Sequence, residues 1–393
     1  MLLIHSFWHP RGGDTTSLAM QREALVARGH DVVPFGTRHP DNCPELGDAG
    51  WPGWRDPGSR SALPGAVWSL AASAALRRVL RGSAPFDVAH IHHLHRHLTP
   101  SILPVLRGAG VRVVWTLHDY ELSCPTAHHY RAGKPCFECA GGATWPALRH
   151  RCSRLGPSTW DAVALVAEKQ VYRAFGALAA VDVFIAPSRY LADRMKREVP
   201  PDRIVHVPNP VRLPAVLASG PRAGVVFAGR LVEEKGVHDV LAIAQALPSV
   251  AFTLLGDGPL LGQVRASGLR NVEARGAVRH EEVVAALAAA AAVLVPSRWP
   301  ENDPYAVTEA QAAGATVLAS RIGGIPEQIE HGVDGLLCPP SEPAAWVRSL
   351  AEVLGDEVAA VEMGERARLR VAQARNPDRI AIALEAVYTR SRS

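Results

Sequence analysis

Short apolar runs alternate with longer helical patterns along most of the chain. The runs that end in Gly, Pro or polar residues occupy positions 111–117, 181–186, 225–228, 251–255, 292–295 and 316–319. Short apolar runs bounded in this way are typical of buried strands, and their alternation with helices is the rhythm of parallel βαβ sheets. We therefore predict an α/β protein with Rossmann-like, doubly wound domains.

The length of 393 residues fits two such domains better than one. Four prolines interrupt residues 207–221, which excludes a single helix or a central strand there. We place a first domain at 1–214, a second at 215–376 and a separate C-terminal helix in 377–393. Two irregular insertions are expected in the first domain, at 36–64 and 120–156, and such insertions in compact domains are usually functional or mobile.

Composition is that of a globular protein, with 48% hydrophobic and 20% charged residues. The longest apolar candidate, the Ala-rich run 283–295, is too short to span a bilayer and suits a buried helix running into a strand. The N-terminal residues read as a first strand and lack the pattern of a secretion signal. We therefore expect a cytoplasmic protein.

Charge is uneven along the chain. Residues 1–214 carry 25 Lys and Arg against 17 Asp and Glu, whereas the remainder carries 17 against 21. A basic first half is compatible with an anionic acceptor or peripheral contact with a membrane surface. Solvated charges without a partner explain it equally well. Nucleic acid fits poorly, because the sequence has no compact basic stripe or known binding motif.

The segment 227–236, FAGRLVEEKG, joins a predicted strand to a predicted helix. Gly229 allows a sharp turn at the end of the strand. Arg230 and Lys235 then lie at the carboxyl edge of the sheet, where ligands of α/β proteins bind, and two fixed cations suit a diphosphate. Alternatively, both cations simply pair with the neighbouring Glu233 and Glu234.

The segment 300–314, PENDPYAVTEAQAAG, follows the strand at 292–295. Its turn opens a helix, with Pro304 at a first helical position and Gly314 as the stop. The N-terminus of that helix offers unpaired N–H groups to diphosphate oxygens. Glu301 lies just before the helix and Glu309 inside it, so one carboxylate could hold a ribose and the other a sugar.

Here the chain resembles the retaining glycosyltransferases of family 4, which have the GT-B fold. Glu301 and Glu309 reproduce the E-x7-E element of that family. The flanking residues match as well: WPEN at 299–302, EAQAAG at 309–314, IGGIPE at 322–327, GVDGLL at 332–337, GRLVEEKG at 229–236 and LGDGP at 255–259. The resemblance implies two Rossmann-like domains facing each other across a cleft, with the C-terminal helix crossing back to the first.

The resemblance also implies roles for single residues. Arg230 and Lys235 would bind the donor diphosphate, Glu309 the ribose hydroxyls and Glu301 the transferred sugar near its reacting carbon. Backbone near Val278 would meet the base. The helix start would complete the donor site; its residues are Asn302, Asp303, Pro304 and Tyr305.

Two features of the first domain match the family less specifically. Gly12 and Gly13 follow the first strand and resemble the glycine loop beside the donor phosphate. They do not form G-x-G-x-x-G, which argues against a nicotinamide dehydrogenase. His118 ends the strand 111–117, and by the resemblance it contacts the donor sugar. The alternative is a histidine that is only capped by Asp119.

Clustered histidines and cysteines raise the question of a metal. The histidines at 90, 92, 93, 95 and 97 lack interleaved acids at ligand spacing, so metal binding is disfavoured there. A second cluster is formed by Cys124, Cys136, Cys139 and Cys152. Its C-x2-C with flanking cysteines suits a structural zinc in a reducing compartment, with unliganded thiols as the alternative.

The resulting hypothesis is a retaining glycosyltransferase that moves a sugar from a nucleoside diphosphate to an acceptor hydroxyl. Cations replace a catalytic metal, so no cofactor is required. The rivals are an epimerase or phosphorylase of the same fold and a non-catalytic sugar-binding protein. High Ala, Arg, Gly and Pro usage indicates a GC-rich bacterial genome, and so a secondary-metabolite or cell-envelope acceptor. Neither the donor sugar and base nor the acceptor can be read from the sequence.

Overall fold

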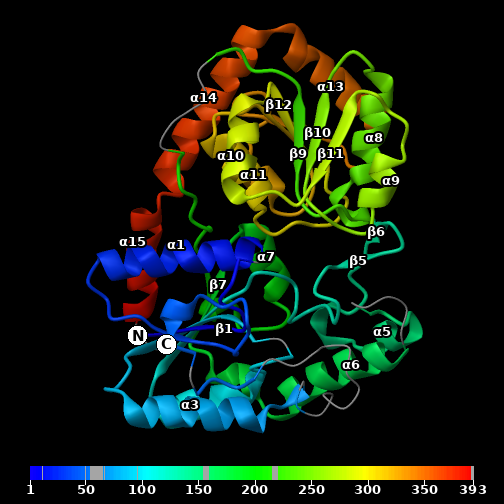
Figure 1. Ribbon diagram of the computed structural model, residues 1–393. Helices are drawn as coiled ribbons and strands as arrows, with labels where there is room; N and C mark the ends of the chain where they lie inside the picture. Colours follow the sequence, from blue (N-terminus) through cyan, green and yellow to red (C-terminus); the bar gives the residue numbers. More distant parts are fainter. Residues whose placement is uncertain are drawn as a thin grey trace. The chain divides into compact units, whose positions relative to one another are not determined.

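The computed structural model describes residues 1–10, 12–48, 50–53, 65, 67–94, 96–153, 159–214 and 220–390. Parts of both predicted insertions, of the proline-rich stretch and His95 lie outside these residues. The chain forms two compact units (Figure 1). Unit 1 comprises residues 1–129, 137–209 and 377–393, and unit 2 comprises 130–136 and 210–376.

Unit 1 is built on a parallel six-stranded sheet in the order β2-β1-β3-β4-β7-β8. Its strands are β1 (Leu2–His5), β2 (Val33–Phe35), β3 (Val88–His93), β4 (Arg112–Thr116), β7 (Val183–Ala186) and β8 (Ile204–His206). Its helices are α1 (Gly13–Ala27), α3 (Leu70–Gly82), α4 (Leu103–Gly108), α5 (Trp145–Arg149), α6 (Thr159–Ala174), α7 (Arg189–Met195) and α15 (Pro377–Thr389). The order of the strands is that of a doubly wound fold.

The C-terminal helix α15 packs beside α1 in unit 1 (Figure 1). Glu385 on α15 accepts hydrogen bonds from Arg28 and His30, just beyond the end of α1. Tyr388, also on α15, bonds to His90 on β3. The last helix is therefore part of the core of unit 1, although unit 2 precedes it in the sequence.

Unit 2 repeats the architecture with the strand order β11-β10-β9-β12-β13-β14, again parallel. Its strands are β9 (Val225–Ala228), β10 (Phe252–Leu255), β11 (Val272–Gly276), β12 (Ala292–Val295), β13 (Val317–Ser320) and β14 (Leu336–Cys338). Its helices are α8 (Val237–Ala246), α9 (Leu261–Arg265), α10 (His280–Ala289), α11 (Tyr305–Ala312), α12 (Ile325–Gln328), α13 (Pro343–Gly355) and α14 (Glu357–Ala374). A small antiparallel hairpin, β5 (Tyr130–Arg131) and β6 (Lys134–Pro135), also belongs to this unit.

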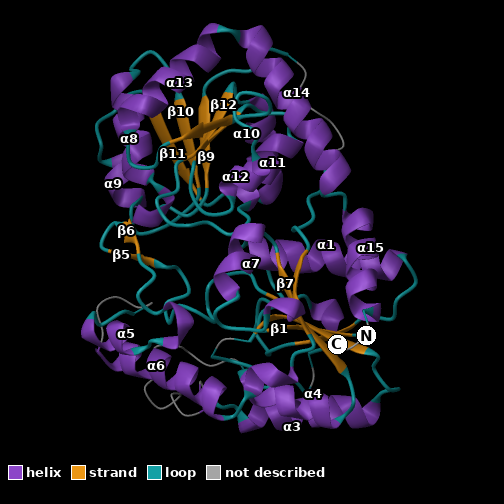
Figure 2. Cartoon of the chain, turned by 180° about the vertical axis from the view of Figure 1, so that it is seen from behind, coloured by secondary structure: helices purple, strands orange, loops and turns teal. Residues whose placement is uncertain are grey.

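Side chains of the central strand β9 alternate between two cores. Val225 and Phe227 pack with α8 and α13, whereas Val226 packs with α10 and α11. Helices cover both faces of this sheet (Figure 2). A sheet that is covered on both faces needs apolar residues at every position, which explains why its strands read as continuous apolar runs. The Ala-rich run 283–295 is helix α10 leading into β12, as its composition predicts.

No helix among the described residues is long and apolar enough to cross a membrane. The predicted α/β class with two doubly wound domains is confirmed by the two parallel sheets.

Candidate functional site

The loops that follow β9 and β12 bring Lys235 and Glu301 together in unit 2. Lys235 Nζ lies 2.6 Å from Glu301 Oε1, and the Ser297 hydroxyl donates to the same oxygen at 2.7 Å. The side chain of Glu301 is only 5% exposed, that of Lys235 22%. Lys235 Nζ also lies 5.4 Å from the centre of the Trp299 ring, within cation–π range. A cation and a carboxylate are thus fixed at one edge of the sheet.

Two glycines allow this close approach. Gly236 has φ 77°, and a Cβ atom there would overlap the Pro296 carbonyl of the facing loop. Gly323 has φ 61°, and a Cβ there would overlap the backbone of Glu301, whose carbonyl accepts a hydrogen bond from Gly324 at 2.8 Å. Only glycine combines this left-handed backbone with so little space. The two loops are therefore held by backbone contact and not by side chains alone.

Arg230 stands apart from that pair. Its side chain is 59% exposed, and its Nη2 lies 3.5 Å from Glu234 Oε1. Gly229 ends β9 next to it and donates to Leu255 O at 2.9 Å. The alternative in which both cations pair with neighbouring glutamates thus holds only for Arg230, because Lys235 pairs with Glu301. Arg230 is an exposed guanidinium beside a fixed ammonium group.

Helix α11 carries the second carboxylate of the element E-x7-E. The helix begins at Tyr305, with Pro304 as its N-cap, and Gly314 follows its end with φ 72°. Pro304 therefore lies one residue earlier than predicted. Burial raises the pKa of Glu309, and His280, whose Nε2 lies 3.9 Å from Glu309 Oε1, acts in the opposite direction. A carboxylate in this setting can accept hydrogen bonds from hydroxyl groups.

Asp303 does not offer its side chain to a ligand in this structure. Both carboxylate oxygens bind the guanidinium of Arg375 at 2.8 Å, and Gln328 donates to one of them at 2.6 Å. The carboxylate is 1% exposed. The carboxylate of Asp303 therefore fixes the start of α11, and its place in the donor site stays a prediction. Asp303 could meet a donor only through its backbone.

The other residues predicted for the donor site are also partly used by the fold. Asn302 is buried, and the Tyr305 hydroxyl donates to Pro210 O at 2.9 Å. Val278 packs its side chain against the core formed with α10 and α11.

In unit 1, the predicted glycine loop closes onto the first turn of α1. The Thr15 hydroxyl donates to Gly12 O at 2.9 Å and accepts from Gly12 N at 3.2 Å. Gly13 is the first residue of the helix. The amino end of α1, which begins at Gly13, therefore presents the N–H groups of its first turn next to the loop of Gly12, the kind of site that binds anions.

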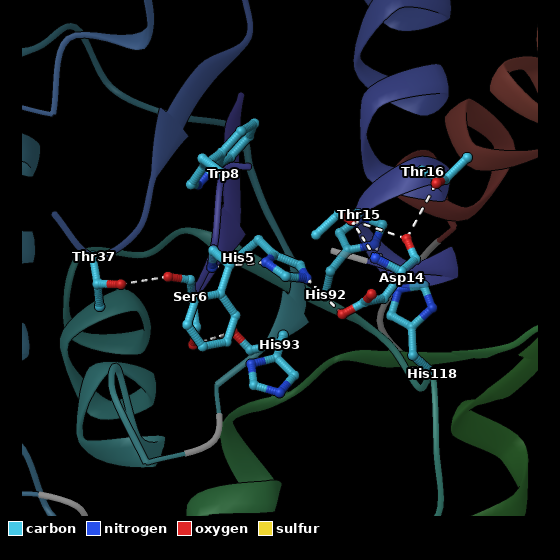
Figure 3. Close-up of polar contacts among 12 residues, drawn as sticks. His5, Ser6, Trp8, Asp14, Thr15, Thr16, Thr37, His92, His93 and His118 are labelled. Atoms are coloured by element: carbon cyan, nitrogen blue, oxygen red, sulfur yellow. Dashed lines mark hydrogen bonds and ion pairs between the residues drawn. The ribbon is translucent and has the colours of Figure 1, made fainter. Parts of the chain in front are cut away.

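His118 lies two residues beyond the end of β4, in a cluster of histidines (Figure 3). Its Nε2 is 2.9 Å from Nδ1 of His92, and the two rings stack with centres 5.1 Å apart. Next to them, His5 Nε2 lies 3.2 Å from Asp14 Oδ2. Asp119 instead accepts a hydrogen bond from Glu121 N at 2.8 Å. His118 thus has a buried imidazole partner that the sequence alone does not indicate.

The histidines of β3 make hydrogen bonds and ring contacts. His90 bonds to the hydroxyls of Tyr388 and Thr116 at 2.8 and 2.7 Å. Burial and the nearby His118 lower the pKa of His90 to about 3, so this imidazole is neutral. The rings of His93 and His97 pack against Phe7, and His95 lies outside the described residues.

Among the described residues, only His9, His39 and Asp41 gather three potential metal ligands within 4.8 Å of one another. The rings of His9 and His39 stack at 4.4 Å and 27°, so their nitrogen lone pairs do not converge on one point. Cys124, Cys136, Cys139 and Cys152 are thiols and form no such group in the described part of the chain. The zinc hypothesis for these cysteines stays a prediction.

Sequence reasoning missed four residues of these two clusters. His5 and Asp14 in unit 1 frame the glycine loop, and His92 stood out in the sequence only as a candidate metal ligand. Ser297 in unit 2 donates to Glu301. One signal was available, since Asp14 directly follows Gly12-Gly13 at a helix start, where its charge is favoured.

The whole chain superposes on solved two-domain enzymes with the GT-B fold. Sucrose-phosphate synthase from Thermosynechococcus elongatus matches with a TM-score of 0.71 at 19% identity, covering 98% of this chain and 97% of that one. The Anabaena protein Alr3699/HepE in complex with UDP matches with a TM-score of 0.66 at 18% identity, covering 98% of each chain. The two Rossmann-like units therefore define the GT-B fold class.

The sequence matches two family descriptions, each over a different part of the chain. Residues 11–213 match Glycosyltransferase Family 4, and residues 215–370 match Glycosyl transferases group 1. The chain belongs to glycosyltransferase family 4.

Curated relatives match only part of the chain. A glycogen synthase from Mycobacterium tuberculosis (strain CDC 1551 / Oshkosh) is 33% identical over 185 residues, which are 44% of this chain and 44% of that protein. A D-inositol 3-phosphate glycosyltransferase from Corynebacterium efficiens is 33% identical over 167 residues, 39% of this chain and 38% of that protein. The matches thus span less than half of the length of either relative.

Proposed function

We propose that this protein is a retaining glycosyltransferase that moves a sugar from a nucleoside diphosphate to an acceptor hydroxyl. The observation that carries the proposal is the contact between Lys235 and Glu301 at the carboxyl edge of the unit 2 sheet, with the second glutamate, Glu309, on helix α11 that follows. Ligands of α/β proteins bind at that edge. Solved structures of the same fold are complexes with UDP, UDP-glucose or ADP, which favours a nucleotide-sugar donor.

Each group of unit 2 has a chemical task in this proposal. The exposed Arg230 and the fixed Lys235 bind the diphosphate, with the N–H groups at the start of α11 beside them. Glu309 accepts hydrogen bonds from the ribose hydroxyls. Glu301 positions the transferred sugar. Its Oε1 already accepts two hydrogen bonds, which suits a positioning group better than a nucleophile.

In the proposed reaction the bond between the anomeric carbon and the diphosphate oxygen breaks, and the acceptor hydroxyl oxygen bonds to that carbon from the same face. The hydroxyl proton passes to the departing phosphate oxygen. Negative charge grows on the diphosphate and positive charge on the sugar as the bond breaks. Arg230 and Lys235 stabilise the leaving group electrostatically, so the step needs no divalent metal.

Unit 1 supplies the groups for the sugar and the acceptor. His118 donates a hydrogen bond to the transferred sugar, and the loop of Gly12 and Gly13 meets the donor phosphate through its backbone. The acceptor is a small molecule or glycan with a hydroxyl group. A bacterial cell-envelope or secondary-metabolite acceptor fits the composition.

Thermal shift with a panel of nucleotides is the first experiment. UDP, GDP, ADP and dTDP are tested separately with the full chain, because a ligand that binds only the folded state raises the melting temperature. At least one of them is expected to raise it by several degrees at a hundredfold excess over its Kd. No shift with any nucleotide or its sugars overturns the proposal.

Variants of the donor site then test the residue roles with the nucleotide that binds. Glu309→Gln removes a charged acceptor and is expected to weaken binding by about 10- to 100-fold. Arg230→Ala is expected to reduce turnover by about 100-fold or more through loss of leaving-group stabilisation.

Arg366→Ala is the matched control, because Arg366 also pairs with a glutamate four residues away at 3.5 Å. It is expected to keep normal turnover. Near-normal kinetics of Glu309→Gln and Arg230→Ala would remove both residues from the site.

A further inference from the structure

Unit 1 holds a cluster of imidazoles at the carboxyl ends of β1, β3 and β4, and the roles given above account for only part of it. Figure 3 shows His5, His92, His93 and His118 around the single carboxylate of Asp14. His5 and His92 are at most 2% exposed. Buried polar groups need hydrogen-bond partners, so the proton positions in this cluster can be worked out from its contacts.

The tautomer of His5 follows from a backbone contact. Phe7 N–H donates to His5 Nδ1 at 2.9 Å, so this nitrogen must carry a lone pair. The proton of the neutral ring is therefore on Nε2, from which it is donated to Asp14 Oδ2 at 3.2 Å. A second proton on His5 would be on Nδ1, where it would face the Phe7 N–H, and two donors cannot form a hydrogen bond with each other. His5 is thus a fixed neutral donor to Asp14.

Asp14 is consequently the anion of the cluster. Burial opposes its ionisation, but the hydrogen bond from His5 and the nearby imidazoles of His118 and His93 hold the pKa of this carboxyl well below its usual range. Asp14 also lies in the first turn of α1, where the helix dipole favours a negative charge. Its side chain is 31% exposed, so the charge is accessible to solvent and to ligands.

His92 is the partner of His118 and has one unsatisfied nitrogen. Its Nδ1 lies 2.9 Å from His118 Nε2, while its Nε2 has no hydrogen-bond partner among the described residues. Burial, followed by the neighbouring His90, His118 and His5, lowers the pKa of His92 well below its ordinary value. His92 is therefore neutral and carries one proton.

The position of that proton follows from the unsatisfied nitrogen. If the proton were on Nε2, a buried N–H would lack an acceptor, and orphaned buried N–H groups are rare in proteins. If it is on Nδ1, the unsatisfied atom is only a lone pair, and Nδ1–H donates to His118 Nε2. The second arrangement is favoured because it leaves no buried N–H group without a hydrogen-bond acceptor.

We propose that His92 is a positioning residue that fixes His118 as its Nδ1–H tautomer by donating a hydrogen bond to Nε2. His118 then acts towards oxygen atoms of a sugar or phosphate as a neutral hydrogen-bond donor and not as a base. A second proton on His118 would face the Nδ1–H of His92 and would force the proton of His92 onto its orphaned Nε2. The inference rests on the proposed function only where it assigns the oxygen that His118 contacts.

The groups that face His118 come from several elements. Asp14 follows the β1–α1 loop, His5 lies on β1, and His90, His92 and His93 lie on β3; Asp119 is its chain neighbour. Asp14 attracts a proton to His118, whereas His92 opposes one. His92 therefore controls which ring nitrogen of His118 carries the proton, and not only the charge of His118.

The test is two-bond 1H–15N NMR of the histidine rings, which distinguishes Nδ1–H, Nε2–H and imidazolium forms. The His118 signals are assigned by their loss in His118→Gln. In the wild-type protein at pH 7 the expected form of His118 is Nδ1–H. An Nε2–H or imidazolium form there overturns the proposal whether or not the His92 variants fold.

Variants of His92 sharpen the test. His92→Leu removes the donor and is expected to convert His118 to a mixture of tautomers and to lower kcat/KM by about tenfold. His92→Asn can place an amide N–H near the position of Nδ1 and is expected to restore the Nδ1–H form and most of the activity. An unchanged His118 tautomer in His92→Leu contradicts the role.

His90→Asn is the matched control, because His90 is equally buried on the same strand and its ring lies 4.3 Å from that of His92. It is expected to lower stability without changing the tautomer of His118. The NMR result is independent of catalysis. If no nucleotide sugar is turned over but His118 is the Nδ1–H form, the proposed function fails and the tautomer assignment stands.

Discussion

The two units place polar groups at the same position of a parallel sheet, but with opposite chemistry. At the carboxyl edge of unit 2, Lys235 and Glu301 form an ion pair, and Asp303 is clamped by Arg375. At the corresponding edge of unit 1, a cluster of histidines lies beside one carboxylate, that of Asp14, and burial keeps His90 and His92 neutral. The difference teaches that one architecture can serve an anionic ligand through fixed charge and a neutral one through fixed tautomers.

The largest expected effect comes from removing one partner of a buried ion pair in unit 2. Arg375→Met leaves Asp303, with its 1% exposed carboxylate, buried without its cation. It is expected to lower the free energy of unfolding of unit 2 by about 3–5 kcal/mol. Urea denaturation measures the change. The double variant Asp303→Asn/Arg375→Met is expected to recover much of the loss, and a single variant as stable as the wild type would show that the pair carries no such role.

The next effect tests the neutral imidazoles of unit 1 by lowering the pH. The pKa of His90 is about 3 in the folded protein against an ordinary value of 6.5, so the unfolded chain binds this proton more readily. Stability from the neutral imidazole is therefore present above about pH 6.5 and is lost as the pH falls towards 3. By pH 5 the loss from this one group is about 2 kcal/mol.

Urea midpoints at pH 7.5, 6 and 5 measure this dependence. His90→Asn removes the titrating group, so its stability is expected to fall less steeply below pH 6.5 than that of the wild type. A residual slope remains because burial lowers the pKa of His92 as well. Equal slopes in the two proteins would mean that His90 does not stay neutral in the folded state.

The smallest effect concerns the charged contact between α15 and the end of α1. Hydrogen bonds from Arg28 and His30 lower the pKa of Glu385 to about 2 from its ordinary 4.5. Its contribution to stability is therefore present above about pH 4.5 and is lost as the pH falls through 2. Glu385→Gln is expected to melt slightly below the wild type at pH 7, with the difference shrinking in acid and at high salt. A difference that grows in acid contradicts the assignment.

The fold was predictable because its strands are buried on both faces. Such strands appear in the sequence as apolar runs, and the runs at 225–228 and 292–295 coincide with β9 and β12. The bounds of α11 were predictable to within a residue, since a proline and a glycine mark its ends.

Residues of the candidate site could be named from the sequence only where each stands in a recognisable motif. Lys235, Glu301 and Glu309 stand in contiguous motifs, and the structure brings the first two into contact. The partner of Asp303, by contrast, lies 72 residues further on, so nothing in the turn sequence indicated that its carboxylate was already used. The histidine cluster could not be predicted from the sequence for the same reason, because His5, His92 and His118 come from three different strand regions.

The contact between Gly236 and the Pro296 carbonyl has a consequence for the energetics of ligand binding. Because backbone meets backbone there, the loop that carries Lys235 cannot move independently of the loop that carries Ser297 and Glu301. The conformational entropy of ordering both loops is lost during folding and not when a ligand arrives. Association with a nucleotide at this edge should then be limited by diffusion and desolvation, with little slow rearrangement of the loops themselves.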